Sequence, residues 1–204
     1  MTTPPATAAR VPALAMPLRR LPLAALLVGL VLPLGDVDAA SAGGVSFPET
    51  ITLGGESLPI VGVGLRSKWM VKVYAMAVYQ KTPTKSAGHL IKADESKFIW
   101  IKMLRTIDGD KMRDAIREGL ENNVPESTRK AIEGSVAKLE KAFPGEIPKG
   151  ANIGFWYVPG RGTVLQLGDV DKARLPGKRF MSSLWAIWFG KDPADSDLKK
   201  SVLR

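Results

Sequence analysis

The sequence predicts an α+β fold in which helices pack on one face of a large antiparallel sheet. Three observations predict it: strands and helices come in groups, two strand pairs are joined by glycine-containing turns, and the longest strands are apolar on both faces. The chain has 204 residues, of which 45% are hydrophobic, so one domain can bury a substantial core. No repeat and no internal linker divides it.

The first 42 residues have the composition of a secretory signal peptide. Arginines precede the apolar run LPLAALLVGLVLPL, and small residues at cleavage spacing place the cut after Ala39 or Ala42. A membrane anchor is the alternative, but this run is shorter than the roughly 20 residues that span a bilayer. We therefore expect a leader at 1–42, a domain at 43–204, and a bacterial periplasmic or secreted protein without stable membrane insertion after cleavage.

The first part of the domain reads as strands. Residues 49–53 and 57–63 flank the turn sequence GGES, which predicts an opening hairpin. The run MVKVYAMAVY at 70–79 is apolar on both faces, so it is expected to be the central strand. A short helix capped by Ser86 follows, and the next strand is expected at 97–106.

Two amphipathic helices come next. The first begins near Asp108, after which apolar residues recur at helical spacing with charges between them. The second opens at Pro125 and ends before Pro144. Because the two helices follow one another directly, we expect them in the same layer.

The C-terminal third adds a hairpin and two further helices. Residues 151–169 contain two strand-like runs on either side of a PGRG turn. Residues 177–190 place large apolar side chains on one face of a helix, and Asp192 and Pro193 are expected to cap the last helix.

The composition excludes several kinds of chemistry. The chain has no cysteine and one histidine, so thiol catalysis is excluded and a zinc site lacks its usual ligands. His89 has no serine or acid at a suggestive spacing, and no dinucleotide or Walker motif is present. The formal charge of +9 comes from scattered basic residues without stacking aromatics between them. We expect no catalytic residues, metal, cofactor or nucleic-acid partner, and the oligomeric state stays open.

The remaining chemical signal lies in VGLRSKWMVKVYAMAVYQ, residues 63–80, which reads as a buried strand. Arg66 cannot shed its charge, so its burial requires an internal acid or an anionic ligand. If the strand alternates faces without a bulge, Tyr74 points to the same side as Arg66, and the two offer donors to a carboxylate or phenolate. Alternatively, Arg66 caps a hairpin in solvent and Tyr74 only packs, and the spacing does not decide between these readings.

This stretch resembles the chalcone isomerase-like family. The resemblance is carried by FPETITLGGESLPIVGVGLRSKWMVKVYAMAVYQ, LRTIDGDKMRDAIREGLENN and LWAIWFGKDPADSDLKKSVL, which with the second hairpin cover residues 45–204. More narrowly, the chain is similar to the family's bacterial exported branch. The family includes plant enzymes that cyclise chalcones, plastid fatty-acid-binding proteins and non-catalytic helpers. The resemblance implies an open-faced β-sandwich, a large antiparallel sheet with helices packed on one face.

The resemblance also assigns roles to individual residues. Arg66 matches the arginine that holds the substrate oxyanion in the enzymes and the carboxylate in the fatty-acid binders. Tyr74 matches a position that is threonine in the enzymes and tyrosine in the binders. The polar active-site residues of the enzymes fall near Met112, Gly119 and Ile187, which offer no such hydrogen bonds. The contacts that position a chalcone for ring closure are therefore missing.

The leading hypothesis is a binding protein that holds a lipophilic carboxylate, such as a fatty acid, between sheet and helices without catalysis. Arg66 would pair with the head group and Tyr74 would donate a second hydrogen bond. The tail channel is expected to be lined by Met112, Ile116, Trp185 and Trp188. The alternative is an intramolecular lyase or isomerase acting on a chalcone-like phenolic enone. A lower alternative is an apolar cofactor such as haem, with Tyr74 or His89 as its ligand.

Overall fold

The computed structural model of the protein describes residues 39–204. Its strands are β1 (Ala39–Ala42), β2 (Val45–Pro48), β3 (Thr50–Leu53), β4 (Glu56–Lys68), β5 (Val71–Gln80), β6 (Lys97–Met103), β7 (Ile107–Asp108), β8 (Glu146–Ile147), β9 (Asn152–Val158), β10 (Gly162–Leu167) and β11 (Val170–Leu175). Its helices are α1 (Ala87–Lys92), α2 (Gly109–Asn123), α3 (Glu126–Ala142), α4 (Lys178–Phe189) and α5 (Ser196–Val202).

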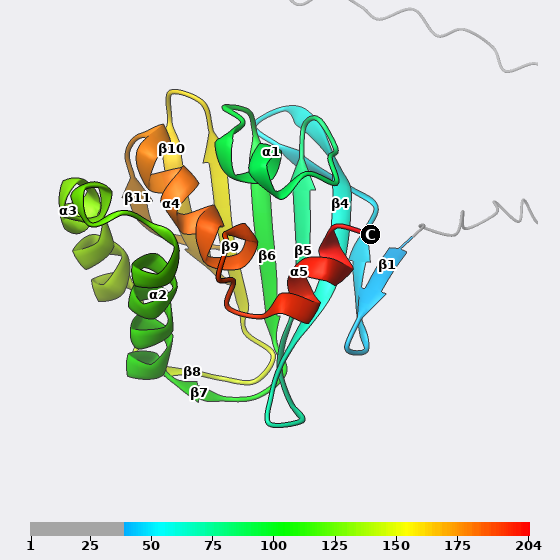
Figure 1. Ribbon diagram of the computed structural model, residues 1–204. Coiled ribbons are helices and arrows are strands. Elements are labelled where there is room, and N and C mark those ends of the chain that lie inside the picture. The colour runs from blue at the N-terminus through cyan, green and yellow to red at the C-terminus, as the bar shows by residue number, and fades with distance from the viewer. Residues whose placement is uncertain (1–38) are drawn as a thin grey trace, which may run out of the picture. The chain divides into compact units, whose positions relative to one another are not determined.

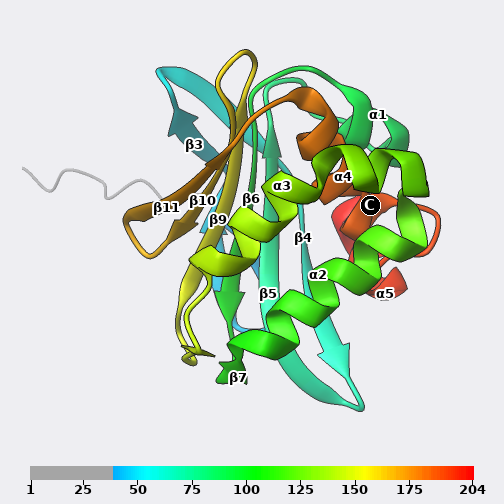
Figure 2. The ribbon, with the colours of Figure 1, turned by 90° about the vertical axis from the view of Figure 1, so that its left-hand side faces the viewer.

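Seven strands form one antiparallel sheet in the order β11-β10-β9-β6-β5-β4-β3 (Figure 1). The helices pack on one face of this sheet, as Figure 2 shows from the side. The predicted α+β class, with an antiparallel sheet and helices on one face, is therefore confirmed. Two short pairings, β1 with β2 and β7 with β8, lie outside the main sheet.

The central position of β5 explains its apolar sequence. Tyr74, Met76 and Val78 belong to the hydrophobic cluster beneath the helices. The alternate residues Ala75 and Ala77 belong to a second cluster on the opposite face, which the β1–β2 hairpin helps to cover through Phe47. Because both faces of β5 are covered, both sets of side chains are buried, as the sequence predicted.

Side-chain caps fix where three helices begin. Ser86 caps α1 by accepting a hydrogen bond from the His89 amide at 3.3 Å, and Asp108 caps α2, as predicted. The predicted cap of the last helix is wrong: Asp195 Oδ1, not Asp192 with Pro193, accepts from the first amides of α5. Several acids lie close together in the sequence DPADSD, and local spacing does not say which of them reaches the helix amides.

The apolar run at 63–80 is a hairpin and not one strand. β4 continues to Lys68, the chain turns at Trp69 and Met70, and β5 begins at Val71. Both turn residues have positive φ, 53° and 64°, which a non-glycine residue rarely adopts. Tryptophan and methionine therefore do not signal a turn at this point in the sequence. The edge strand β11 also escaped the sequence analysis, because its residues VDKARL are mostly charged and exposed.

The predicted leader lies outside the described residues apart from its last few positions. Ala39–Ala42 form β1, which pairs with β2 along its whole length. Cleavage after Ala39 leaves most of this hairpin in place, whereas cleavage after Ala42 removes β1. If the predicted leader is removed, the position of the cut would decide whether the β1–β2 hairpin remains.

A row of buried polar side chains crosses the sheet at the end that α1 covers. Gln80, Lys97, Tyr157 and Thr163 are cross-strand neighbours on β5, β6, β9 and β10, and each is at most 2% exposed. Lys97 Nζ donates to the Leu90 carbonyl at 2.8 Å. Burial lowers the pKa of Lys97 from 10.5 to about 8, against the opposing effect of nearby acids.

This lowered pKa predicts that the protein gains stability between pH 8 and pH 10. The unfolded chain binds a proton at Lys97 up to its ordinary pKa of 10.5, whereas the folded protein releases it near 8, so the free energy of unfolding rises with pH in this window. The slope is at most about 1.4 kcal/mol per pH unit. We expect urea denaturation at pH 7.5 and 9.5 to show this gain, and a Lys97→Met variant to lose it. Equal pH dependence in the two proteins would contradict the assignment.

Candidate functional site

Arg66 and Tyr74 face each other across the β4–β5 hairpin. They are direct register partners in the antiparallel ladder, immediately before a bulge at Arg66 and Ser67. The guanidinium carbon of Arg66 lies 5.6 Å from the centroid of the Tyr74 ring. The two side chains therefore lie on the same helix-covered face of the sheet, as predicted. The reason is that they pair across two strands, whereas the prediction relied on their spacing along one strand.

The Tyr74 hydroxyl is buried and partly engaged. Trp188 Nε1 on α4 donates a hydrogen bond of 2.8 Å to Tyr74 Oη. Burial raises the pKa of Tyr74, and the Arg66 charge and the Trp188 hydrogen bond oppose that shift. The hydroxyl thus keeps its proton at neutral pH, and within residues 39–204 no acceptor receives it. Tyr74 holds an unused hydrogen-bond donor next to Arg66.

The charge of Arg66 has no internal counter-ion within residues 39–204. No carboxylate of this part of the chain lies within 4.0 Å of its guanidinium nitrogens. Asp195 is nearby, but its Oδ1 accepts the amides of Asp197 and Leu198, both at 2.9 Å, and its Oδ2 accepts the amide of Ser67 at 3.3 Å. Asp195 keeps its charge, but its hydrogen bonds go to backbone amides, and it forms no direct ion pair with Arg66.

Two glycines on β4 let α5 approach closely enough for these contacts. A Cβ at Gly62 would lie 2.2 Å from the Val202 carbonyl oxygen, and one at Gly64 would lie 2.9 Å from Leu198 Cγ. Any larger residue would push α5 away from the strand. The glycines of GVGLRS therefore serve helix packing, which accounts for them without nucleotide binding.

Arg66 lines two adjoining hollows of different character. The first is an apolar cavity of about 20 Å³ between the sheet, α2 and α4, which has room for one water molecule. Its walls include Tyr74, Ile101, Ile153 and Phe155 from the sheet, Met112, Ala115 and Ile116 from α2, and Ile187 and Trp188 from α4. The second is a polar cleft of about 300 Å³, lined also by Lys68, Glu118, Asn122 and Pro193. Arg66 thus lies between a solvent-accessible cleft and an apolar interior.

The structure brings most of the predicted site residues together. Arg66, Tyr74, Met112, Ile116 and Trp188 all line the small apolar cavity. Trp185 does not line it.

Trp185 is fully buried, and its ring centroid lies 5.8 Å from Lys97 Nζ. It lies one helical turn from Trp188, and the sequence analysis expected both tryptophans to line the tail channel. In the folded protein, Trp185 lies beside Lys97, whereas Trp188 donates its hydrogen bond to Tyr74.

The sequence analysis missed a clamp at the edge of the cleft. Asn123, at the end of α2, donates from Nδ2 to the Asp192 carbonyl at 2.6 Å and accepts the Asp192 amide through Oδ1 at 2.9 Å. Lys199 Nζ adds a hydrogen bond of 2.7 Å to the Gly190 carbonyl. These contacts hold the segment between α4 and α5 against α2, beside Arg66. The Asn123 side chain makes the hydrogen bonds that a backbone amide group would make. Nothing in a single sequence identifies an asparagine with this role.

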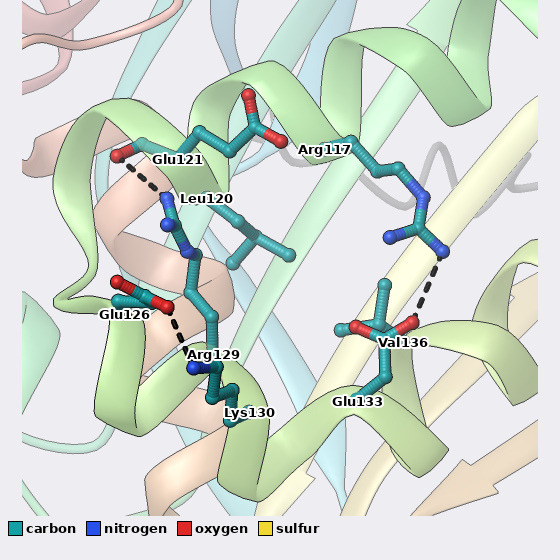
Figure 3. A pocket seen from close by; sticks show the side chains of 8 residues that line it. All are labelled: Arg117, Leu120, Glu121, Glu126, Arg129, Lys130, Glu133 and Val136. Carbon is teal, nitrogen blue, oxygen red and sulfur yellow. Dashed lines mark hydrogen bonds and ion pairs between the residues drawn. The ribbon is translucent and has the colours of Figure 1, made fainter.

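The groove between α2 and α3 and the single histidine have less of the character of a ligand-binding site. The groove of about 390 Å³ between α2 and α3 has its charges paired internally, Arg117 with Glu133 and Lys130 with Glu126 (Figure 3). His89 Nε2 lies 3.2 Å from Glu95 Oε1 and lines neither hollow at Arg66. In residues 39–204 no group of three or more His, Cys, Asp or Glu side chains is placed to hold a metal ion.

Among residues 39–204, no helix is both long enough and apolar enough to cross a bilayer.

Comparisons with known proteins identify a family and structural neighbours. A family model described as chalcone isomerase-like matches residues 39–204. A fatty-acid-binding protein of Arabidopsis thaliana has a similar structure, with a TM-score of 0.63 over 81% of this chain and 96% of that chain. The two sequences are 16% identical, so this likeness concerns the fold. No curated protein matches the chain.

Proposed function

Because this chain belongs to the chalcone isomerase-like family, we propose that it is an exported, non-catalytic binding protein for lipophilic carboxylates such as fatty acids. The predicted chalcone isomerase-like fold is confirmed by the family match and by the structural likeness to a fatty-acid-binding protein. The proposed ligand places its carboxylate at Arg66 and its hydrocarbon tail between the sheet and the helices.

One observation carries the proposal: a cation and a hydroxyl donor, neither paired with a carboxylate of residues 39–204, meet at the border of an apolar interior. Arg66 has no carboxylate partner among residues 39–204, and the Tyr74 hydroxyl has a proton to donate. A carboxylate accepts from both groups at once, and charge-assisted hydrogen bonds of this kind are the strong ones. A half-buried arginine left without such a partner is costly.

The tail requires side chains to move, because the apolar cavity of about 20 Å³ holds only one water molecule. Met112 and Ile187 face each other there from α2 and α4. Methionine is flexible and fills irregular space, so it is suited to making room for a tail. We propose that α2 and α4 separate slightly on binding, with the polar cleft as the route by which the ligand enters.

The isomerase alternative has less support. Its polar positions fall at Met112, Gly119 and Ile187, and a Cβ at Gly119 would lie 2.6 Å from Ile187 Cγ2. Helix packing therefore occupies the space that a hydrogen-bonding side chain at 119 would need. Arg66 and Tyr74 alone offer a place for a phenolate but nothing that holds an enone against it.

Export is proposed from the sequence of the leader, in a chain similar to the exported bacterial branch. Expression of the full chain in a bacterial host, with fractionation and intact-mass measurement, tests it. A processed mass that begins after Ala39 or Ala42, found in the periplasm or the medium, is expected. An unprocessed cytoplasmic chain contradicts export.

Binding is tested by native mass spectrometry of the processed protein, followed by denaturation and identification of any released molecule. We expect a fatty acid to co-purify, and palmitate to bind in a calorimetric titration of delipidated protein. Methyl palmitate is the matched control, because it keeps the tail and loses the charge. Equal binding of acid and ester refutes a carboxylate site, and turnover of a chalcone above the buffer rate favours the isomerase.

A further inference from the structure

The tip of the β4–β5 hairpin exposes two large apolar side chains. Trp69 is 88% exposed and Met70 is 100% exposed, more than any other large hydrophobic residue of the described chain. Figure 1 shows the hairpin extending past the neighbouring strands at the lower end of the sheet. Within residues 39–204, nothing buries these side chains, so they contribute little to the stability of the fold.

The backbone at this tip is unfavourable for the residues it carries. Trp69 and Met70 have φ of 53° and 64°, the left-handed conformation that a two-residue hairpin turn requires. Asparagine and glycine adopt it readily, whereas bulky side chains do so at a cost. Trp69 and Met70 occupy this unfavourable turn without packing against the rest of the described chain. This combination indicates that the two side chains contact another molecule.

The charges around the tip have one sign. Between Glu56 and Asp94 the sequence contains no acidic residue. Lys68 and Lys72 flank the tip on its two strands, and neither pairs with a carboxylate of residues 39–204.

Acids do lie at the same end of the sheet, where α2 begins. Asp108 there caps α2, and Asp110 pairs with Arg113. Glu146 on β8, the register partner of Asp108, also lies at this end. Residues 57–93 themselves contain no acid, so the hairpin tip presents positive charge beside apolar surface.

We propose that this tip binds the surface of an anionic lipid bilayer. Tryptophan is enriched at the membrane–water interface, where its ring lies among the head groups, and the exposed methionine reaches the acyl boundary. Lysines beside such a contact are attracted to anionic head groups. The contact is peripheral and reversible, since it involves two apolar side chains and no spanning segment.

The position of the tip relates the bilayer to the cleft at Arg66. Lys68, next to Trp69, lines that cleft together with Arg66 and Ser67. A hairpin tip at the lipid surface therefore brings the cleft close to the head groups. The membrane contact itself does not depend on which ligand Arg66 holds, so either proposal can fail without the other.

The test is flotation of the processed protein with vesicles of phosphatidylcholine, alone or mixed with phosphatidylglycerol. We expect binding to the mixed vesicles that weakens as salt is raised and is much weaker without the anionic lipid. The double variant Trp69→Asn with Met70→Gly installs the residues that the turn prefers. It should raise the melting temperature while lowering the partition coefficient roughly tenfold or more, a combination that unfolding cannot produce.

Two further variants separate the apolar from the charged part of the contact. Lys68→Gln with Lys72→Gln should lower binding roughly tenfold on mixed vesicles and change little on phosphatidylcholine. Val170→Ser alters an exposed apolar side chain elsewhere, 54% exposed at the start of β11, and should leave binding unchanged. Equal flotation of wild type and the Asn–Gly variant overturns the proposal. So does a wild-type dimer that the Asn–Gly variant converts to monomer without any vesicle binding.

Discussion

An Arg66→Ala variant is expected to bind palmitate roughly 30-fold or more weakly than the wild type, because it removes the cation beside the Tyr74 hydroxyl. The residual affinity should equal that of methyl palmitate for either protein, since the tail contacts remain. Calorimetric titration of delipidated protein measures both ligands under the same conditions. Because Arg66 has no ion pair within residues 39–204, its removal should not lower the melting temperature.

The chain offers a matched control for this variant. Arg174 lies over the Trp156 ring at 5.4 Å, much as Arg66 lies over Tyr74 at 5.6 Å, but it lines neither hollow at Arg66. An Arg174→Ala variant removes the same charge and a similar ring contact. It should bind palmitate as the wild type does. If both variants lose affinity equally, net charge explains the effect and the proposed head-group site is wrong.

A Gly62→Val variant is expected to have the largest effect on stability, lowering the free energy of unfolding by about 3 kcal/mol. The added Cβ would lie 2.2 Å from the Val202 carbonyl oxygen, which belongs to helix backbone and cannot rotate aside. The helix α5 must shift, so the buried contacts of Leu198 and Val202 weaken. Urea denaturation measures the loss.

Strand propensity alone would predict that Gly62→Val stabilises the protein, because valine is favoured over glycine in strands. The expected loss of stability therefore comes from the contact with α5. Gly134 on α3 provides the control, because a Cβ there meets nothing within 4 Å. A Gly134→Ala variant should gain roughly 0.5–1 kcal/mol, as alanine in a helix does. A Gly62→Val variant as stable as the wild type would show that α5 does not press on β4 as described.

Much of the fold was predictable because its signals are local. Alternating or continuous apolar runs marked the main strands, and Ser86 and Asp108 marked helix starts by their own side-chain chemistry. The turn at Trp69 and Met70 was not predictable, since its residues contradict the preference of the turn they form. The edge strand β11 was missed because one exposed, charged strand of a sheet has no apolar run.

The candidate site was predictable only in part, for a physical reason. The identity of Arg66 and Tyr74 as an unusual buried pair follows from charge and hydropathy, but their direct register requires the hairpin. The role of Asp195 depends on which amides its carboxylate reaches, and that is a property of packed tertiary structure. Trp185 and Trp188 look equivalent in sequence. Only the packing of α4 places Trp185 beside Lys97 and Trp188 beside Tyr74.

The contact of Asp195 with Ser67 joins residues separated by 128 positions in the chain. Contacts of such long separation form late, because the closure of a large loop must precede them. The strand β4, which carries Arg66, can pair with β5 early because a short hairpin joins them. Its contacts with α5 can form only after that distant helix has folded onto the sheet. We therefore expect the surroundings of Arg66 to be completed late in folding, and a chain truncated before α5 to lack the Ser67–Asp195 contact beside the proposed anion site.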